Sequence, residues 1–416
     1  MRYVNGKAED LKIAYIGGGS RGWAWGLMSD LAAADDMSGS VYLYDIDLEA
    51  AKRNEVIGNK VKELKDCKSP WDYKAVETIG EALQGADFVV ISILPGTFDE
   101  MESDVHAPEK YGIYQSVGDT TGPGGLIRAL RVVPMFEEIA GAIKEYCPEA
   151  WVINYTNPMT VCVKTLYRTF PEIKAFGCCH EVFGTQKLLG KALEDILQIK
   201  DAQREDIRVN VVGVNHFTWL TSAQYKNIDL FPVYREFALK YKDTGFGEKT
   251  DENWMNKFFD SLEMVKLDLF LKYGAIAAAG DRHLAEFCPG SWYLKNPDTA
   301  HSWGFKLTPV AWRKEDLKNL ARSERLYKGE EEMVINTTGE EGVQQMRSLL
   351  GLRDLVTNVN IPNYGQIPNL PLGAVVETNA HFCADSVRPV FAGALPESIY
   401  PLVSRVCGVQ ELTVEA

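Results

Sequence analysis

Short apolar runs alternate with longer amphipathic stretches as far as residue 190. Four of these runs have the length and apolar content of buried strands: 11–16, 40–44, 86–93 and 150–154. The stretches between them repeat apolar residues at helical spacing, and the longest are 48–65 and 131–146. Strands that alternate with helices form parallel sheets with helices on both faces. The pattern therefore predicts an α/β fold with a doubly wound parallel sheet.

The pattern is less regular in the second half of the chain. Residues 206–214 alternate as a strand, and three further stretches are predicted to be helices: 254–273, 313–329 and 387–409. Residues 358–371 are rich in Pro, Asn and Gly. No linker rich in Gly and Ser separates the halves. We therefore predict two closely packed domains, residues 1–190 with the parallel sheet and residues 191–416 with an α+β fold.

Composition and charge narrow the class of protein. Hydrophobic residues make up 46% and charged residues 25% of the chain, as in globular proteins. The net charge of −14 argues against nucleic acid or an anionic membrane as a partner. No apolar run reaches the ~20 residues of a transmembrane helix, and the N-terminal segment is too acidic for a signal peptide. The eight cysteines form no disulfide framework, so we expect a reduced, cytoplasmic protein whose thiols can bind a metal.

The clearest motif is a glycine-rich turn between the first strand and the first helix. Gly17, Gly19 and Gly22 have the G-x-G-x-x-G spacing of dinucleotide-binding sites: the first makes the tight turn, the second admits the pyrophosphate, and the third lets the helix approach the strand. Asp45 ends the second strand and is placed to bind the adenosine ribose hydroxyls, which favours NAD over NADP. The alternative is a glycine-rich turn that binds another nucleotide or none. The motif predicts a Rossmann-like NAD-binding domain over residues 1–190.

Neighbouring segments extend this predicted cofactor site. Ser20 lies within the glycine-rich loop, and Pro95 follows the third strand, where the nicotinamide half of the cofactor is expected to pass. A second glycine-rich segment, 120–125, leads into the next helix. Its backbone either approaches a ligand closely or serves only as a turn.

Cysteine and histidine side chains at two strand ends are candidate metal ligands. Cys179 and His180 follow an apolar run, and His216 follows the strand predicted at 206–214. One thiolate and one imidazole leave coordination positions open, as in catalytic sites whose divalent ion also binds substrate. The alternative is a buried core thiol and a hydrogen-bonded core histidine.

Three polar residues are candidates for substrate binding and proton transfer. Asn157 follows a strand at the carboxyl edge of the sheet, where it either binds a sugar hydroxyl or caps the next helix. Asp281 is a candidate base, and Arg282 is placed to hold it or to bind an anionic substrate. The alternative for these two residues is an ion pair within a loop.

Taken together, these segments resemble glycoside hydrolase family 4, the NAD- and divalent-metal-dependent glycosidases. The resemblance extends over nearly the whole chain and rests on the order of its motifs: Ile16–Ser20, Asp45, Thr121–Gly125, Asn157–Pro158, Cys179–Val182, Gly213–His216 and Gly365–Pro371. The sequence Cys-His-Glu-Val at 179–182 is similar to the subgroup that acts on α-linked uronic acids.

The resemblance assigns roles to several residues. It implies that Cys179 and His216 are ligands of a divalent metal such as manganese, that His180 is the general acid and that Asp281 is the base. Relatives often carry Gln-Glu before the Thr-Thr-Gly-Pro-Gly-Gly loop, whereas Gly-Asp stands here, so Asp119 is a candidate catalytic residue that departs from the family pattern.

The resemblance also implies how substrate is held. Asn157 matches the substrate-binding Asn of the family. A uronate needs a cationic partner, and Arg282 is the main candidate, with Arg128 and Lys295 as alternatives. The residues after 190 are then expected to supply substrate and metal binding and the contacts of a homodimer or homotetramer.

The implied reaction is hydrolysis through transient oxidation. NAD⁺ takes a hydride from carbon 3 of the sugar, and the metal polarises the resulting ketone as a Lewis acid. The base removes the proton on carbon 2, the leaving group departs with help from the acid, water adds, and the hydride returns. The expected substrate is a small acidic sugar, an α-galacturonide or an α-glucuronide.

Other functions stay open at this point. One is an α-glucosidase or α-galactosidase of the same family. Another is an NAD-dependent dehydrogenase of the lactate and malate type, which the run 126–158 also resembles, although the catalytic His and partner Asp of that superfamily are not found. A third is a non-catalytic NAD-binding sensor, which would not depend on metal.

Overall fold

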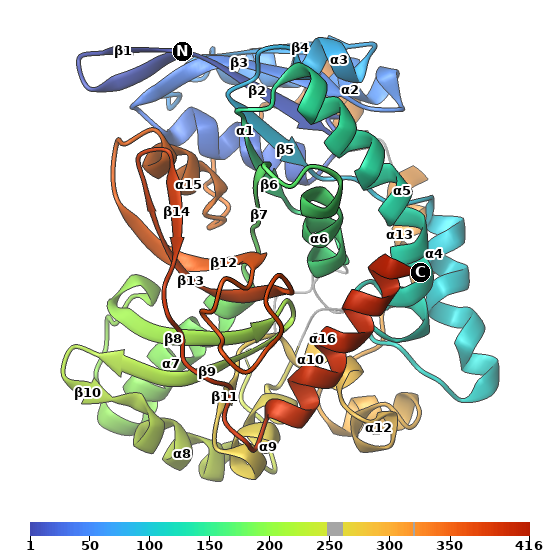
Figure 1. The fold of residues 1–416 in the computed structure, drawn as a ribbon, viewed down its shortest axis with the longest axis vertical. Coiled ribbons are helices and arrows are strands. Elements are labelled where there is room, and N and C mark those ends of the chain that lie inside the picture. The colour runs from blue at the N-terminus through green and yellow to red at the C-terminus, as the bar shows by residue number, and fades with distance from the viewer. Residues whose placement is uncertain (248–260, 319–320) are drawn as a thin grey trace.

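The fold is built around one mixed sheet (Figure 1). The computed structural model describes residues 1–247, 261–318 and 321–416. Parallel strands lie in the order β4-β3-β2-β5-β6-β7, with bounds β2 (Lys7–Ile16), β3 (Met37–Tyr44), β4 (Trp71–Val76), β5 (Phe88–Ile91), β6 (Trp151–Asn154) and β7 (Lys174–Gly177). Beyond β7 the sheet continues with antiparallel strands β12 (Leu355–Pro362), β13 (Val375–Cys383) and β14 (Ser386–Pro389), and β1 (Arg2–Val4) pairs with β2.

Helices cover both faces of this sheet. The first half of the chain supplies α1 (Trp23–Ala33), α2 (Leu48–Val61), α3 (Ile79–Leu83), α4 (Phe98–His106), η1 (Ala107–Tyr111), α5 (Gly122–Tyr146), α6 (Met159–Thr169) and α7 (Glu181–Leu197). Alternate residues of β2 point to opposite faces: Ile13 and Tyr15 pack with α1 and α15 (Gly342–Leu349), whereas Ala14 and Ile16 pack with α5 and α6. The predicted α/β fold with a doubly wound sheet is therefore confirmed.

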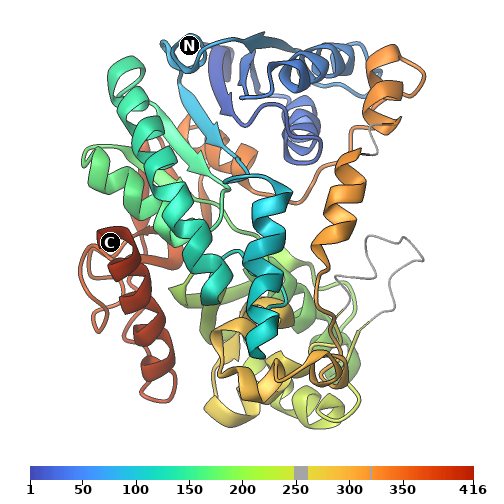
Figure 2. The ribbon, with the colours of Figure 1, turned by 90° about the vertical axis from the view of Figure 1, so that its right-hand side faces the viewer.

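A second, smaller sheet lies in the other half of the molecule. It contains β8 (Ile207–Val214), β9 (Phe217–Tyr225), β10 (Ile228–Asp229) and β11 (Ile276–Ala277), all antiparallel to their neighbours. The surrounding helices are η2 (Arg204–Asp206), α8 (Leu230–Tyr241), α9 (Met264–Tyr273), α10 (Asp281–Phe287), α11 (Gly290–Tyr293) and α12 (Pro297–Ser302). Figure 2 shows α16 (Tyr400–Glu415) beside the long helix α5, so the end of the chain returns to the first half.

The second half departs from the sequence prediction in several places. The predicted closing helix at 387–409 is wrong: β14 and a loop come first, and α16 begins only at Tyr400. Pro389 and Pro396 explain the difference, since proline disrupts a helix interior. The helix predicted over 313–329 corresponds to α13 (Val310–Lys318) and α14 (Ala321–Lys328), and of the helix predicted over 254–273 the part at 254–260 lies outside the described residues.

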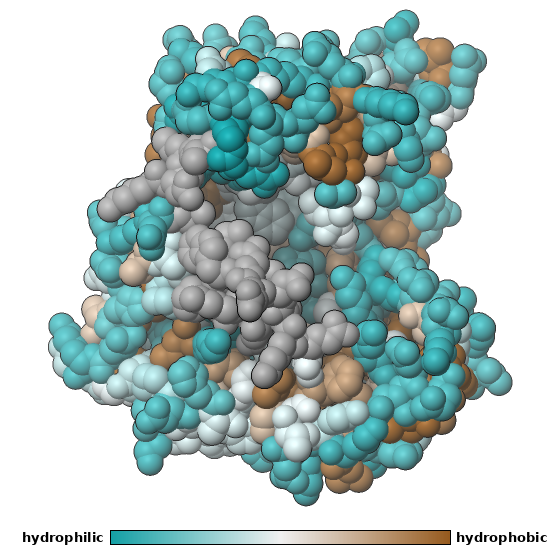
Figure 3. Space-filling model, turned by 180° about the vertical axis from the view of Figure 1, so that it is seen from behind, coloured by the Kyte–Doolittle hydropathy of each residue, from teal (hydrophilic) through white to brown (hydrophobic). Residues whose placement is uncertain are grey.

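The two halves of the chain share the main sheet. The boundary predicted at residue 190 falls within α7, and β12–β14 complete the sheet that β2–β7 begin. The face seen in Figure 3 is mostly hydrophilic where the structure describes it, with separate hydrophobic patches. Among the described residues, no helix combines the length and the apolar character needed to span a bilayer.

Candidate active site

The glycine-rich loop runs from the end of β2 into α1 at the carboxyl edge of the sheet. Gly17 has φ +94°, and a Cβ there would lie 2.0 Å from the carbonyl oxygen of Ser92, so only glycine fits. A Cβ on Gly18 would lie 2.7 Å from Cβ of Leu43, whereas a Cβ on Gly22 would meet no atom within 4 Å. The close backbone approach that we expected at Gly22 is therefore made by Gly17 and Gly18.

Side chains of the next strand and helix fix the shape of this loop. The Asp45 carboxylate accepts a hydrogen bond from the backbone N–H of Gly19 at 2.8 Å. Asn54 on α2 donates to the carbonyl oxygens of Gly18 and Ser20, both at 2.8 Å. Asn54 was not predicted, because nothing in its sequence spacing distinguishes it from other polar residues of the helix. The loop is thus held from both sides by short hydrogen bonds.

The loop is open to solvent at its outer side. Ile46 directly follows Asp45, and 96% of this residue is exposed beyond the end of β3. Ser20 accepts a hydrogen bond from the backbone N–H of Trp23, the first residue of α1, at 3.2 Å. Pro95 follows β5 at the same edge, and its carbonyl oxygen accepts from Arg131 at 3.4 Å.

A cluster of ionisable side chains forms where four segments of the chain converge. Asp119 precedes α5, His216 lies between β8 and β9, and His283 lies on α10, yet one ligand atom from each lies within 4.8 Å of the others. Asn157, between β6 and α6, donates to Asp119 at 3.3 Å. The structure therefore brings together three residues singled out from the sequence, Asp119, Asn157 and His216, and adds His283.

Hydrogen bonding fixes the tautomer of His216. The hydroxyl of Thr120 donates to Asp119 at 2.7 Å and lies 3.0 Å from Nδ1 of His216. Because a hydroxyl has one proton, Thr120 accepts from Nδ1–H, which leaves the lone pair of Nε2 available for a ligand. Burial, with His283 alongside, lowers the pKa of His216 to about 3, so the ring is neutral at physiological pH.

The backbone at His216 is unusual. Val214 pairs with Phe217, so Asn215 and His216 form the two-residue turn between β8 and β9. His216 has φ +61°, in the left-handed region that few residues other than Gly adopt, although Asn, Asp and His enter it more often than the rest. Only 4% of the residue is exposed. A buried histidine in a left-handed turn is typical of a position kept for function.

Cys179 is buried. Among the described residues, the ligand atoms that lie within 4.8 Å of one another belong to Asp119, His216 and His283, and the Cys179 thiol is not one of them. It packs against Met159 and Val163 of α6 and against β13. Asn358 donates to its carbonyl oxygen at 3.0 Å. Burial raises the pKa of the Cys179 thiol well above its ordinary value, so the sulfur is protonated unless a cation replaces the proton.

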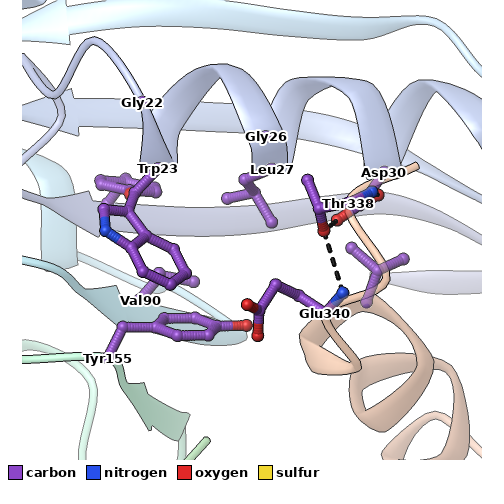
Figure 4. Close-up of a pocket in the computed structure, with 11 residues that line it drawn as sticks. Gly22, Trp23, Gly26, Leu27, Asp30, Val90, Tyr155, Thr338 and Glu340 are labelled. Carbon is purple, nitrogen blue, oxygen red and sulfur yellow. Dashed lines mark hydrogen bonds between the residues drawn. The ribbon is translucent and has the colours of Figure 1, made fainter. Parts of the chain in front are cut away.

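His180 lies at the start of α7 and its side chain is half exposed. Its Nδ1 lies 2.6 Å from the carboxylate of Glu340, and this hydrogen bond raises the pKa of His180. Glu340 also lines a cavity of about 250 Å³ between α1 and β5 (Figure 4). Trp23 and Tyr155 pack together at one end of that cavity, with ring centroids 5.3 Å apart.

Asp281 and Arg282 each contact the backbone of another segment of the chain. The fully buried Asp281 accepts hydrogen bonds from the backbone N–H groups of Val265 at 3.1 Å and Lys266 at 3.0 Å, so it caps the start of α9. Arg282 donates to the carbonyl oxygen of Ser116 at 2.6 Å. The structure therefore gives both side chains structural partners and does not place Asp281 with His216.

Two further residues at the cluster were not predicted. The Glu181 carboxylate accepts the N–H of Gly280 at 2.6 Å and lies 3.8 Å from Nε2 of His283. Although burial opposes it, the neighbouring His283 and His216 lower the pKa of Glu181 to about 2. The only signal for His283 in the sequence was its place in Gly280–His283. The sequence did not show which residue of this segment faces the site.

The fold and the site together define an α/β protein with a glycine-rich loop of the dinucleotide-binding type and a histidine and carboxylate cluster at the carboxyl edge of its sheet. The family models described as "Family 4 glycosyl hydrolase" and "Family 4 glycosyl hydrolase C-terminal domain" match residues 12–195 and 211–416. The chain belongs to glycosyl hydrolase family 4, as the sequence motifs predicted.

Individual relatives are similar over the whole chain. An alpha-galacturonidase from Thermoanaerobacterium saccharolyticum is 64% identical over 100% of this chain and 90% of its own length. An alpha-galacturonidase from Bacillus subtilis is 55% identical over 98% of this chain and 90% of its own length. The crystal structure of lplD from Bacillus subtilis superposes with a TM-score of 0.92 at 54% identity, covering 98% of this chain and 92% of that one.

More distant structures share the fold. A 6-phospho-alpha-glucosidase from gut microorganisms, solved with NAD and Mn²⁺, has a TM-score of 0.76 at 20% identity, covering 98% of this chain and 90% of its own. Malate dehydrogenase from Plasmodium falciparum has a TM-score of 0.51 at 12% identity, with 97% of both chains covered. The Rossmann-like type of the first domain is thereby confirmed.

Proposed function

We propose that this chain hydrolyses α-linked galacturonides, using NAD and a divalent cation, with Mn²⁺ as the specific ion. The observation that carries the proposal is the convergence of Asp119, Asn157, His216 and His283 at the sheet edge that also carries the glycine-rich loop. The names of the similar relatives support galacturonide over glucuronide as the substrate. A glycosidase that only hydrolyses needs no dinucleotide loop, so the combination favours a redox-assisted route.

The cofactor loop and the cluster are close enough in the fold to act on one sugar. Gly17 follows β2 and Asn157 follows β6, and only β5 lies between these parallel strands. The strand ends are joined directly, since the N–H of Ile93 donates to Thr156 at 2.9 Å. Ligands of doubly wound sheets lie along this edge. NAD bound at the loop would therefore extend its nicotinamide half past Pro95 towards Asn157.

The residues present fit a divalent cation. Nε2 of His216 offers a free lone pair, as its hydrogen bonding requires. Nδ1 of His283 is shielded from solvent and has no hydrogen-bond partner in the described part of the chain, which points to a missing ligand. We propose His216 as a ligand, Cys179 as the second ligand that the family resemblance implies, and Asp119 and His283 beside the ion. When bound, the cation acts as a Lewis acid on the sugar oxygens.

Two histidines are placed for proton transfer. His180 at the start of α7 is half exposed and is oriented by Glu340, so it suits the general acid that protonates the leaving oxygen. We propose His283 as the base instead of Asp281. The Asp281 carboxylate accepts hydrogen bonds from the backbone of α9, whereas the ring centroid of His283 lies 3.8 Å from that of His216.

The substrate carboxylate needs a cation, and two buried arginines lie near the cluster. Arg282 remains our main candidate, although one of its nitrogens is held by Ser116. Arg128 donates from Nε to the carbonyl oxygen of Asn157 at 3.0 Å, so its guanidinium lies beside the proposed sugar site. Lys295, which is exposed, is the weakest candidate.

We also propose a cytoplasmic location and a homodimeric or homotetrameric assembly. Every cysteine in the chain is a free thiol in the structure, which supports a reducing compartment. The assembly is carried over from the family resemblance alone.

The test compares p-nitrophenyl α-galacturonide, α-glucuronide and α-galactoside as substrates. Enzyme stripped with a chelator and desalted should be inactive, and activity on the galacturonide should return only when NAD⁺ and Mn²⁺ are both added. No NADH should accumulate, because the hydride returns in each turnover. Full activity of the stripped enzyme would reject the redox route. NADH released in step with product would instead identify a dehydrogenase.

A further inference from the structure

The segment that carries Asp119 and Thr120 has no regular secondary structure. Residues 112–121 connect η1 to α5, and Gly118 within them has φ +73°. Such a loop is positioned by the side chains that contact it, since it has no ladder of its own. The position of Asp119 relative to His216 therefore depends on a neighbouring element.

That element is α10. Its Glu286 carboxylate accepts hydrogen bonds from the backbone N–H groups of Val117 at 2.7 Å and Gly118 at 2.8 Å. One turn earlier, Arg282 donates to the carbonyl oxygen of Ser116 at 2.6 Å, and the hydroxyl of Ser116 donates back to the carbonyl oxygen of Arg282 at 2.5 Å. Four hydrogen bonds thus tie one short helix to three consecutive loop residues.

The same helix also carries His283. It therefore supplies one imidazole of the cluster directly and holds the loop that supplies the carboxylate. These contacts leave one polar atom of Glu286 unsatisfied. Its second carboxylate oxygen, Oε2, is shielded from solvent and has no hydrogen-bond partner among the described residues. An unsatisfied buried carboxylate oxygen destabilises a fold by about 1–3 kcal/mol, so this contact is not explained by stability alone.

We propose that Glu286 is a positioning residue: through the N–H groups of Val117 and Gly118 it sets Asp119 and Thr120 against His216. Without it the loop would lose two of its four bonds to α10, and Thr120 would no longer fix the tautomer of His216. This inference rests on the proposed function only in taking the cluster as a cation site.

The test measures Mn²⁺ binding to NAD-free protein by electron paramagnetic resonance, with thermal unfolding as a check on folding. Glu286→Ala should weaken Mn²⁺ binding about 10- to 100-fold, the usual effect of losing a residue that orients a metal ligand. Glu286→Gln keeps an oxygen that can accept both N–H groups, so its binding should stay within about threefold of the parent. Glu55→Ala is the matched control, because Glu55 also accepts a backbone N–H, that of Ala75 at 3.1 Å, but on α2. It should leave Mn²⁺ binding unchanged.

A double variant separates positioning from general support. In an Asp119→Asn background, Glu286→Ala should produce little further loss, because both changes act through the same loop. Fully additive losses, or unchanged Mn²⁺ binding in a folded Glu286→Ala protein, would overturn the inference. If Glu286→Ala does not fold, Glu286→Asp takes its place, because the shorter side chain cannot reach both N–H groups, and undiminished Mn²⁺ binding by that variant would overturn the inference instead. A parent protein that binds no Mn²⁺ would count against the proposed function itself.

Discussion

The cofactor loop and the cation cluster lie along one edge of the sheet but are assembled from different kinds of contact. The loop is a continuous segment, Gly17–Gly22, whose shape comes from missing side chains and from hydrogen bonds to the adjoining β3 and α2. The cluster draws Asp119, His216 and His283 from segments far apart in the chain. A contiguous site is specified locally, whereas a convergent one depends on every element that brings its parts together. A substitution in the loop should therefore change NAD⁺ affinity without changing Mn²⁺ binding, and a substitution in the cluster should do the reverse.

The largest effect is expected at the cation cluster, where substitutions of two adjacent cysteines form a matched pair. Cys179→Ser should weaken Mn²⁺ binding and lower kcat at least about 100-fold, because an alcohol is a far poorer ligand than a thiolate. Cys178→Ser changes a neighbouring buried thiol with no proposed role and should leave both within about threefold, apart from a lower melting temperature. NAD⁺ affinity, followed by fluorescence titration, should be unaffected in both.

Unchanged Mn²⁺ binding by the Cys179→Ser protein would remove Cys179 from the ligand set. The cation would then be held by the three side chains that the structure brings within 4.8 Å, which a His283→Gln variant would confirm by losing Mn²⁺.

A smaller effect is expected on the cofactor side. Asp45→Ala removes the acceptor for Gly19 and the proposed partner of the ribose hydroxyls, so NAD⁺ affinity should fall about 10- to 100-fold, as expected for lost hydrogen bonds to a charged group. Asp47→Ala is the control, since that carboxylate caps α2 at Ala50. Isothermal titration should show normal Mn²⁺ binding in both proteins. Loss of Mn²⁺ binding by Asp45→Ala would contradict the expectation that the loop and the cluster bind their ligands independently.

Local signals in the sequence predicted the strand, the glycine-rich turn and the helix on the cofactor side well. The strand ending at Ile16, the glycine spacing and the acid at Asp45 are all read within a short stretch, because turn chemistry and strand periodicity are local properties. One glycine was given the wrong role even there. We expected Gly22 to allow close packing, but a Cβ on Gly22 would contact no atom within 4 Å, whereas Gly18 packs closely on β3. Close backbone approach is a tertiary fact that spacing alone does not give.

The cluster was only partly predictable. His216 stood out because it follows a strand, but its meeting with His283 depends on long-range packing. Asp281 and His283 lie two residues apart on α10, so their side chains point about 200° apart around the helix. The sequence does not say which of the two faces the site, because a seven-residue helix has too few apolar positions to fix its orientation.

The smallest expected effect decides between those two residues. Asp281→Asn should leave kcat within about threefold, because the side chain caps α9 instead of facing the cluster. It should lower the free energy of unfolding by about 1–2 kcal/mol, because each Asp281 oxygen accepts one backbone N–H and the single amide oxygen of Asn cannot replace both. Burial, with Glu263 nearby, raises the pKa of Asp281 in the folded protein, so this carboxyl stabilises the fold most when protonated, and its contribution falls as the pH rises from near 3.8 towards neutrality. Asn does not titrate, so the difference in melting temperature between the two proteins should be largest at acid pH and shrink towards pH 8. A loss of kcat above about 100-fold with no change in melting temperature would return the role of base to Asp281.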